Sequence, residues 1–288
     1  MLTVFIVALA CYVLFLLLIV YVSIHPARSP IFLSPSVWDI DTENVNFEGE
    51  GINLFGWWIQ PANVRGIVVL AHGYVMNRAE NVSLAVALYK KGFACLLFDS
   101  RACGKSGGVK VGFGWLERND VKSACTFAKQ KLPNKKVFLC GSSMGAAACA
   151  FAISEDQTIA DGLVLDSAYH DLANATLGWW DFVGGKTARF FLAPAVLIGA
   201  PLAGFNPFRV NVGTALKKNK KPVLIIHGTR DSLVPVWHAK KNFDEANNRK
   251  QLALFEGCGH SEMRWVEPER FHNLVCDFIE QCLSESSL

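Results

Sequence analysis

The sequence predicts an α/β domain, with a mostly parallel sheet covered by helices on both faces, preceded by one membrane-spanning helix. Three observations predict this class: an uncharged apolar run opens the chain, strand-like and helix-like segments then alternate, and the helical segments have one apolar face. The length of 288 residues suits one large domain with a small insertion. We therefore divide the chain into an anchor over 1–25, a linker over 26–37 and a main domain over 38–288.

The first predicted element is the anchor helix, Leu2 to Ile24. This segment has no charged residue and is long enough to cross the hydrocarbon core of a bilayer. A cleaved signal peptide is disfavoured, because the positively charged start is missing and no small-residue cleavage site precedes Pro26. Arg28 follows the span, so the positive-inside rule favours a cytoplasmic main domain. The sequence thus predicts a single-pass membrane protein with an uncleaved anchor.

After the linker, strands and helices alternate, which predicts one central sheet. Strands are expected at 52–60, 66–70, 94–98, 137–140, 163–165, 223–227 and 252–255. Helices are expected at 81–91, 121–132, 146–153 and 271–279, where apolar residues recur at helical spacing.

The segment from Asp171 to about Gly213 interrupts this alternation, because it has many aromatic residues and no clear strand. Two interpretations stay open. The aromatic residues pack the core of an insertion, or the insertion is a small helical cap that supplies an apolar acyl pocket. On the second interpretation the pocket residues are Trp179, Trp180, Phe190 and Phe191.

Composition disfavours several other classes. The formal net charge is +3 and no dense Lys/Arg block occurs, so no nucleic-acid surface is expected. The nine cysteines form no C-x-x-C pair, which is typical of small buried side chains in a reducing compartment. No metal or other cofactor is expected, because H-E-x-x-H is missing and Gly104-Lys105-Ser106 lacks the earlier glycine of a phosphate-binding loop.

The stretch Gly141-Ser142-Ser143-Met144-Gly145 lies between an expected strand and an alanine-rich helix. A strand that turns sharply into a helix leaves the central serine strained and exposed, and the flanking glycines let other backbone pass close by. The neighbouring helix N-terminus favours developing negative charge. Ser143 is therefore the predicted nucleophile, whereas Ser142 has the wrong offset from the glycines.

A serine nucleophile needs a base and an orienting acid. Asp231 follows one strand by four residues and His260 follows the next strand by five, which gives the order serine, acid, histidine. Asp166 is the alternative acid. His227, at a strand end, and His238, on an expected surface helix, are poorer bases.

The loop after the strand GIVVL carries His72, Gly73 and Tyr74. Backbone amides in such a loop can point at the oxyanion of a tetrahedral intermediate. We predict that the amides of Tyr74 and Met144 form this oxyanion hole and that His72 has a structural role.

Together the segments AHGYVMN, FDSRACGKSGG, GSSMG, HGTRDSLVP and GCGH resemble the α/β-hydrolase superfamily, from about Phe47 to Ile279. The nearest group is the membrane-anchored, single-domain serine hydrolases known as serine aminopeptidase-like or abhydrolase-domain proteins. The resemblance implies the α/β-hydrolase fold and gives Ser143, Asp231 and His260 the roles of a catalytic triad. It also implies that the turn from Asp99 to Gly107 is structural.

The expected reaction is two-step acyl transfer on an ester, thioester or amide, without a cofactor. The anchor and the aromatic insertion favour a lipid-like or long-chain ester, so an esterase or lipase-like enzyme is preferred to a peptidase. The expected partners are this acyl substrate and a membrane. The alternatives are a peptidase or a membrane-tethered binding or scaffold protein without turnover.

Overall fold

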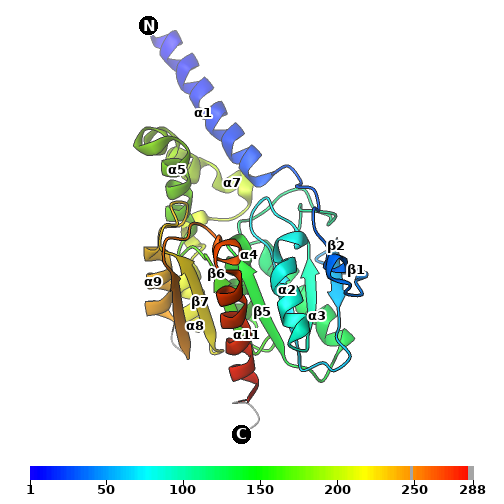
Figure 1. Ribbon diagram of the computed structural model, residues 1–288. Helices are drawn as coiled ribbons and strands as arrows, with labels where there is room; N and C mark the ends of the chain where they lie inside the picture. Colours follow the sequence, from blue (N-terminus) through cyan, green and yellow to red (C-terminus); the bar gives the residue numbers. More distant parts are fainter. Residues whose placement is uncertain (247–248, 285–288) are drawn as a thin grey trace.

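The computed structural model describes residues 1–246 and 249–284. The main domain is built around an eight-stranded sheet (Figure 1). The strands are β1 (Glu43–Gly49), β2 (Ile52–Ile59), β3 (Gly66–Ala71), β4 (Phe93–Phe98), β5 (Val137–Ser142), β6 (Gly162–Asp166), β7 (Val223–Gly228) and β8 (Lys250–Phe255). Their order across the sheet is β1-β2-β4-β3-β5-β6-β7-β8. Strand β2 runs antiparallel to both neighbours, and all other neighbours pair in parallel. The mostly parallel sheet is therefore confirmed, with β1 as an additional strand that the sequence did not predict.

The helices include every one expected from the sequence. They are α1 (Leu2–Ile24), α2 (Val82–Lys90), α3 (Glu117–Lys131), α4 (Met144–Glu155), α5 (Leu172–Leu192), α6 (Pro194–Ile198), α7 (Ala200–Ala203), α8 (Val212–Lys218), α9 (Trp237–Glu245), α10 (Met263–Val266) and α11 (Pro268–Ser284). Short 3₁₀ turns are η1 (Pro35–Trp38), η2 (Arg78–Asn81) and η3 (Pro207–Arg209).

The core has two layers, one on each face of the sheet. Strands β3 to β7 are buried along their whole length, as expected for parallel strands covered on both sides. Helices α3, α4, α8 and α9 pack on one face, and α2 and α11 pack on the other. All nine cysteines are free thiols and eight of them are buried, so they serve as packing residues.

The connection from β6 to β7 forms the cap, which we define as residues 171–213. It contains α5, α6, α7, η3 and the first residues of α8. Helix α5 is broken at Gly184 and Gly185, whose backbone dihedrals are not helical, so its second half changes direction. The cap lies beside α1 at the upper end of the molecule in Figure 1, and the last turns of α11 lie at the opposite end.

Candidate active site

Ser143 occupies the turn between β5 and α4, at the carboxyl edge of the sheet. Its φ of 50° lies in the left-handed region, a strained conformation for a serine. A Cβ at Gly145 would lie 2.4 Å from the carbonyl oxygen of Ala71, and one at Gly141 would lie 2.4 Å from the carbonyl oxygen of Gly145. The two glycines are thus required by close backbone approach, as the sequence predicted.

The structure brings Ser143, His260 and Asp231 together although they come from three separate loops. Nε2 of His260 lies 2.8 Å from Oγ of Ser143, and Nδ1 lies 2.7 Å from Oδ2 of Asp231. With its proton on Nδ1, the imidazole donates to the carboxylate and accepts from the serine hydroxyl. This is the hydrogen-bonded chain through which a serine is activated as a nucleophile.

Asp231 is a fully buried carboxylate held by several donors besides His260. Its Oδ1 accepts from the amides of Leu233 at 3.0 Å and Val234 at 2.7 Å, and Nε2 of His227 lies 3.3 Å from its Oδ2. Burial acts to raise the pKa of Asp231, but the hydrogen bonds from His227 and His260 outweigh it and hold the pKa below its ordinary value. The carboxylate therefore stays ionised opposite the imidazole.

The alternative acid, Asp166, lies at the end of β6 in a different environment. Its carboxylate accepts from Arg264 and, at 2.9 Å, from the hydroxyl of Ser167. Both charged partners are buried, so the aspartate is committed to a structural ion pair. The carboxylate that is hydrogen-bonded to His260 is that of Asp231 and not that of Asp166.

His238 lies on the expected surface helix, α9, but its side chain is on the buried face of that helix. Only 1% of His238 is exposed, because this face of α9 packs against the segment that precedes the cap. Its Nδ1 accepts from the amide of His170 at 3.0 Å, and burial lowers the pKa of His238 to about 4. His238 is therefore a neutral packing residue.

The loop after β3 lies next to the nucleophile, where an oxyanion hole is required. A Cβ at Gly73 would lie 3.6 Å from Cβ of Ser143, and the following residues turn sharply, with a φ of 55° at Val75. The Met144 amide is the first N–H of α4, a position that has no acceptor within the helix. Both predicted donors, Tyr74 and Met144, thus belong to backbone segments that border Ser143. His72, by contrast, accepts from the amide of Ser100 at 3.0 Å and is buried.

Sequence reasoning missed Glu80, a buried carboxylate on η2 that links the loop after β3 to the neighbours of Ser143 and His260. Its Oε2 accepts from the amide of Gly73 at 2.6 Å, and its Oε1 accepts from the hydroxyl of Ser142 at 3.1 Å. The same hydroxyl lies 3.1 Å from that of Ser261, the residue after His260. Glu80 thereby fixes the loop after β3, which we call the oxyanion loop after its proposed role, together with the neighbours of Ser143 and His260.

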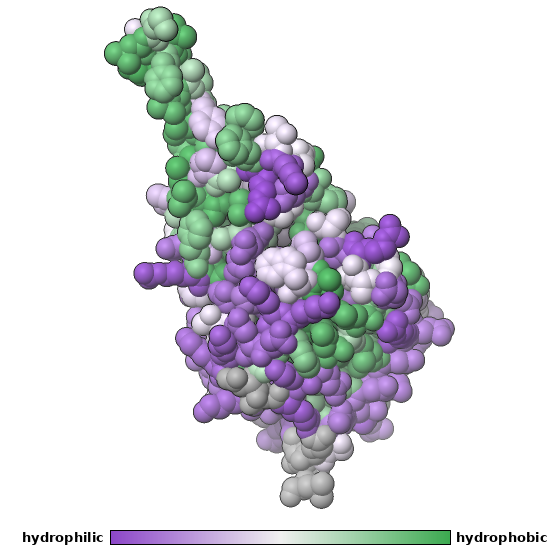
Figure 2. All heavy atoms as spheres, turned by 90° about the vertical axis from the view of Figure 1, so that its left-hand side faces the viewer, coloured by the Kyte–Doolittle hydropathy of each residue, from purple (hydrophilic) through white to green (hydrophobic). Residues whose placement is uncertain are grey.

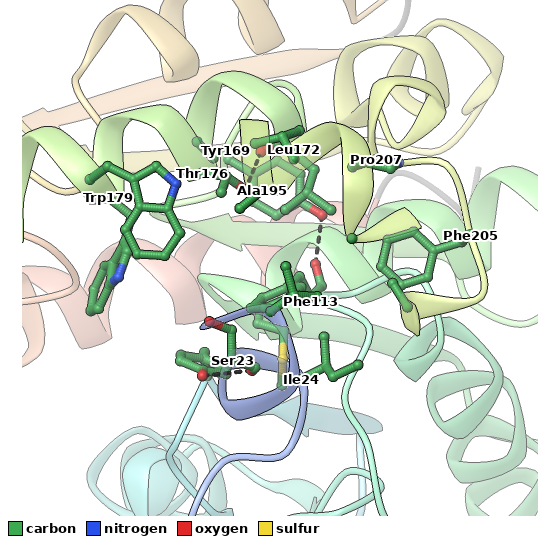
Figure 3. A pocket seen from close by; sticks show the side chains of 18 of the residues that line it. Ser23, Ile24, Phe113, Tyr169, Leu172, Thr176, Trp179, Ala195, Phe205 and Pro207 are labelled. Carbon is green, nitrogen blue, oxygen red and sulfur yellow. Dashed lines mark hydrogen bonds between the residues drawn. The ribbon is translucent and has the colours of Figure 1, made fainter. Parts of the chain in front are cut away.

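A cavity of about 370 Å³ opens beside Ser143 and Met144. Trp179 and Trp180 line it, and Figure 3 shows Leu172, Thr176 and Trp179 of α5 on one side with Ser23 and Ile24 of α1 opposite. Of the described residues that line the cavity, none carries a charge. Its volume lies within the range of small-molecule sites.

Two of the four predicted pocket residues, Phe190 and Phe191, do not line this cavity. They are 76% and 55% exposed, because the break at Gly184 and Gly185 turns the second half of α5 outward. The prediction is therefore wrong for these two phenylalanines. Among the described residues, no group of three or more His, Cys, Asp or Glu side chains is placed to hold a metal ion.

The strand order and the serine on a strand–helix turn define an α/β-hydrolase, and the chain belongs to this superfamily. A family model described as serine aminopeptidase, S33 matches residues 62–196. An esterase from Pyrococcus furiosus superposes with a TM-score of 0.75 and 27% identity, covering 90% of this chain and 98% of the esterase. The α/β hydrolase GrgF from Penicillium sp. sh18 superposes with a TM-score of 0.69 and 16% identity, and the match covers 85% of this chain and 100% of GrgF.

Relatives by sequence include an uncharacterised protein, YqkD of Bacillus subtilis, which is 24% identical over 80% of this chain and 76% of its own length. The α/β-hydrolase domain-containing protein WAV2 of Arabidopsis thaliana is 22% identical over 82% of this chain and 77% of its own length. Together these likenesses support a hydrolytic enzyme.

Proposed function

We propose that this protein is a membrane-anchored serine hydrolase that cleaves long-chain acyl esters. The observation that carries the proposal is the hydrogen-bonded chain Ser143–His260–Asp231, which ends at an uncharged, apolar cavity. A nucleophile at the end of such a cavity meets the carbonyl of an ester whose acyl chain fills the apolar space.

In this mechanism Oγ of Ser143 attacks the ester carbonyl carbon while its proton passes to Nε2 of His260. The oxyanion accepts hydrogen bonds from the amides of Tyr74 and Met144, and Asp231 stabilises the imidazolium. The imidazolium then protonates the departing alcohol, and an acyl-enzyme remains. Water, deprotonated by His260, attacks the acyl carbon and releases the carboxylic acid and the free serine.

An ester is favoured over a peptide because of the charge of the cavity. An aminopeptidase must hold the α-ammonium group of its substrate, and a buried ammonium requires a carboxylate partner. None of the described lining residues is acidic, and the lining consists mostly of aliphatic and aromatic side chains. These surroundings suit a hydrocarbon chain, as does the similarity to an esterase.

The anchor is proposed from the length and composition of α1. Its 23 residues carry no charge, and most of its large apolar side chains are exposed. A helix of this length reaches about 35 Å, enough for the hydrocarbon core of a bilayer. The last turn is hydrogen-bonded to the main domain, because the hydroxyl of Tyr74 donates to the carbonyl of Ser23 at 2.8 Å. This contact favours a retained helix over a cleaved signal sequence.

The test of the nucleophile is covalent labelling of the full chain with a fluorophosphonate. Wild type should gain one adduct and hydrolyse p-nitrophenyl butyrate, whereas Ser143→Ala should do neither. Ser154→Ala is the matched control, because Ser154 lies at the far end of α4 and bonds only to its own helix. Labelling of Ser143→Ala at the wild-type rate would refute the assignment of the nucleophile. A wild type that is neither labelled nor active would favour the alternative, a binding or scaffold protein without turnover.

The test of the anchor is extraction of membranes that contain the full chain. Extraction with carbonate at high pH and extraction with high salt should both leave the protein in the membrane pellet. The insertion of some 20 apolar residues into lipid is effectively irreversible. Release by salt alone would show that α1 does not insert.

A further inference from the structure

The last turn of α1 is part of the wall of the cavity beside Ser143. Val20, Val22, Ser23 and Ile24 all line that cavity, and Figure 3 shows Ser23 and Ile24 closing the side opposite α5. The carbonyl of Ile24 also accepts from the amide of Val111 at 2.8 Å. The proposed anchor therefore completes the pocket in addition to tethering the domain.

The connection from α1 to the domain is held firmly in place. The guanidinium of Arg28 donates to the carbonyls of Cys103, Gly104, Ser106 and Gly108, at 2.6 to 3.3 Å. The side-chain Nδ2 of Asn77 donates to the hydroxyl of Ser29 at 2.9 Å and to the carbonyls of Ser29 and Pro30. These contacts fix the position of the helix relative to Ser143.

The cap runs alongside the apolar helix over more than two of its turns. Val20 packs against Gly199, where a Cβ would lie 2.7 Å from the valine side chain, and the hydroxyl of Tyr12 donates to the carbonyl of Phe191 at 2.5 Å. Tyr12 lies twelve residues before Ile24, a rise of about 18 Å. If α1 crosses a bilayer, the neighbouring part of the cap must therefore enter it as well.

The outer surface of the cap suits that environment. From Leu172 to Ala203 the sequence has only three charged residues, Asp181, Lys186 and Arg189, and two of them form an ion pair at 2.7 Å. Large apolar side chains are exposed there: Phe182, Val183, Phe190, Phe191, Leu197 and Leu202. In Figure 2 hydrophobic residues continue from the protruding helix onto the cap, whereas the body below is largely hydrophilic.

We propose that the cavity receives its acyl chain directly from the bilayer, between the last turn of α1 and the cap. The substrate is then an ester that resides in a membrane, and Val20 helps to set the length of acyl chain that fits. This proposal rests on the proposed function, since it requires Ser143 to be the reactive residue. It adds that the anchor takes part in substrate recognition.

The experiment measures how fast two phosphonofluoridates, one with a two-carbon and one with a sixteen-carbon alkyl chain, label the full chain in lipid nanodiscs. The variant Val20→Phe places a phenyl ring in the cavity. It should lower the ratio of the long-reagent labelling rate to the short-reagent labelling rate about tenfold or more, through overpacking of the cavity. Val7→Phe is the matched control, because Val7 is exposed on the same helix and does not line the cavity.

The outcomes separate the two proposals. If neither reagent labels the wild type, the proposed function fails. If both reagents label it and Val20→Phe leaves their ratio unchanged, only the role of the anchor turn is overturned. Should Val20→Phe lose labelling by both reagents, Val20→Ala decides, because it cannot overpack. It should raise the rate for a reagent with a branched long chain, and an unchanged rate overturns the proposal.

Entry from the bilayer has its own readout. A lipid carrying a photoactivated diazirine in its acyl chain is placed in the nanodisc, and labelled peptides are mapped by mass spectrometry. Peptides from α1 and from residues 182–202 should carry the label, whereas peptides from α3 and α11 should not. Labelling of α1 without labelling of the cap would overturn bilayer entry.

Discussion

Asp231 is held by several hydrogen-bond donors in addition to the imidazole of His260. Two backbone amides bind one of its oxygens, and His227 and His260 approach the other. What the carboxylate alone supplies to His260 is an acceptor for Nδ1–H, which fixes the tautomer that leaves Nε2 free for Ser143. An asparagine at this position has nearly the same shape but can place its NH2 group, a donor, opposite Nδ1 in place of the acceptor oxygen.

Asp231→Asn should therefore lower kcat for a small activated ester by about 10⁴-fold, as in other triads, while the chain still folds. Asp244→Asn is the matched control, since Asp244 is exposed on α9. Steady-state kinetics and a thermal melt of each variant check the expectation. A variant with near-normal kcat would remove Asp231 from the triad.

Glu80→Gln tests the network beneath the site. The amide side chain keeps the size of Glu80 but replaces one acceptor oxygen by an NH2 donor, so when it accepts from the Gly73 amide it can no longer accept from the Ser142 hydroxyl, whose hydrogen bond must reverse. We expect kcat to fall about ten- to hundredfold with little change in KM, because the oxyanion loop is displaced and the cavity is not. A purely structural role would lower Tm and leave kcat unchanged.

The sequence was sufficient to predict the three residues of the proposed triad and insufficient to predict Glu80, for a physical reason. Ser143, Asp231 and His260 each follow a buried parallel strand, and the carboxyl ends of such strands meet at one edge of the sheet. Glu80 sits on a short 3₁₀ turn and gains its role only through loops that are distant in sequence. No local pattern records those contacts.

At the scale of elements, the two departures from prediction are β1 and the second half of α5. Strand β1 lies at the edge of the sheet and exposes Glu43, Asn44 and Asn46, so its sequence is too polar to read as a strand. In α5 the change of direction depends on the dihedrals of Gly184 and Gly185. Two glycines permit a break in a helix, but they do not specify its direction.

Gly145→Ala should destabilise the fold, because its Cβ would meet the backbone of Ala71, the last residue of β3, and of His72, which follows it, at 2.4 to 2.6 Å. Backbone cannot move aside as a side chain can, so we expect a loss of about 3 kcal/mol. Gly178→Ala on α5 is the control, since its nearest neighbour is 3.4 Å away. Thermal unfolding of both variants measures the difference, and equal Tm values would contradict the expectation.

The contact of α9 with the start of the cap predicts a pH dependence. The pKa of His238 is lowered to about 4, so as pH falls the unfolded chain takes up the proton first and stability is lost between about pH 6.5 and 4. His238→Gln still accepts from the His170 amide but does not titrate. Wild type should lose about 2 kcal/mol more than this variant between pH 7 and pH 5.

Thermal unfolding of the detergent-solubilised full chain at the two pH values provides the comparison. The pKa of His170 is raised by its hydrogen bond to Asp171, so His170 contributes stability at low pH that is lost as pH rises. His170 is common to both proteins and largely cancels in the difference. Equal losses in wild type and variant would contradict a neutral, buried His238.

At the scale of the whole molecule, the sequence predicted the apolar span but could not show where its last turn lies. The hydropathy pattern gives the length of the apolar segment from Leu2 to Ile24 and its lack of charge, but not its position relative to the main domain. The position of Ser23 and Ile24 in the cavity wall depends on Arg28, whose four carbonyl partners lie more than seventy residues further along the chain. In the sequence Arg28 indicates membrane topology, and in the structure it also holds the end of α1 against the main domain.

The hydrogen bonds of Arg28 hold α1 in a fixed position against the main domain. If α1 is embedded in a bilayer as proposed, this has a kinetic consequence. An enzyme whose pocket and anchor move as one body searches for substrate by lateral diffusion within a single lipid surface. Its rate should follow the mole fraction of ester in that surface and not the bulk concentration, so diluting the ester with inert phosphatidylcholine at constant total ester should slow turnover in proportion. Hydrolysis of a water-soluble butyrate should be indifferent to this dilution. Ester placed in separate vesicles should remain intact, because the enzyme does not travel between surfaces.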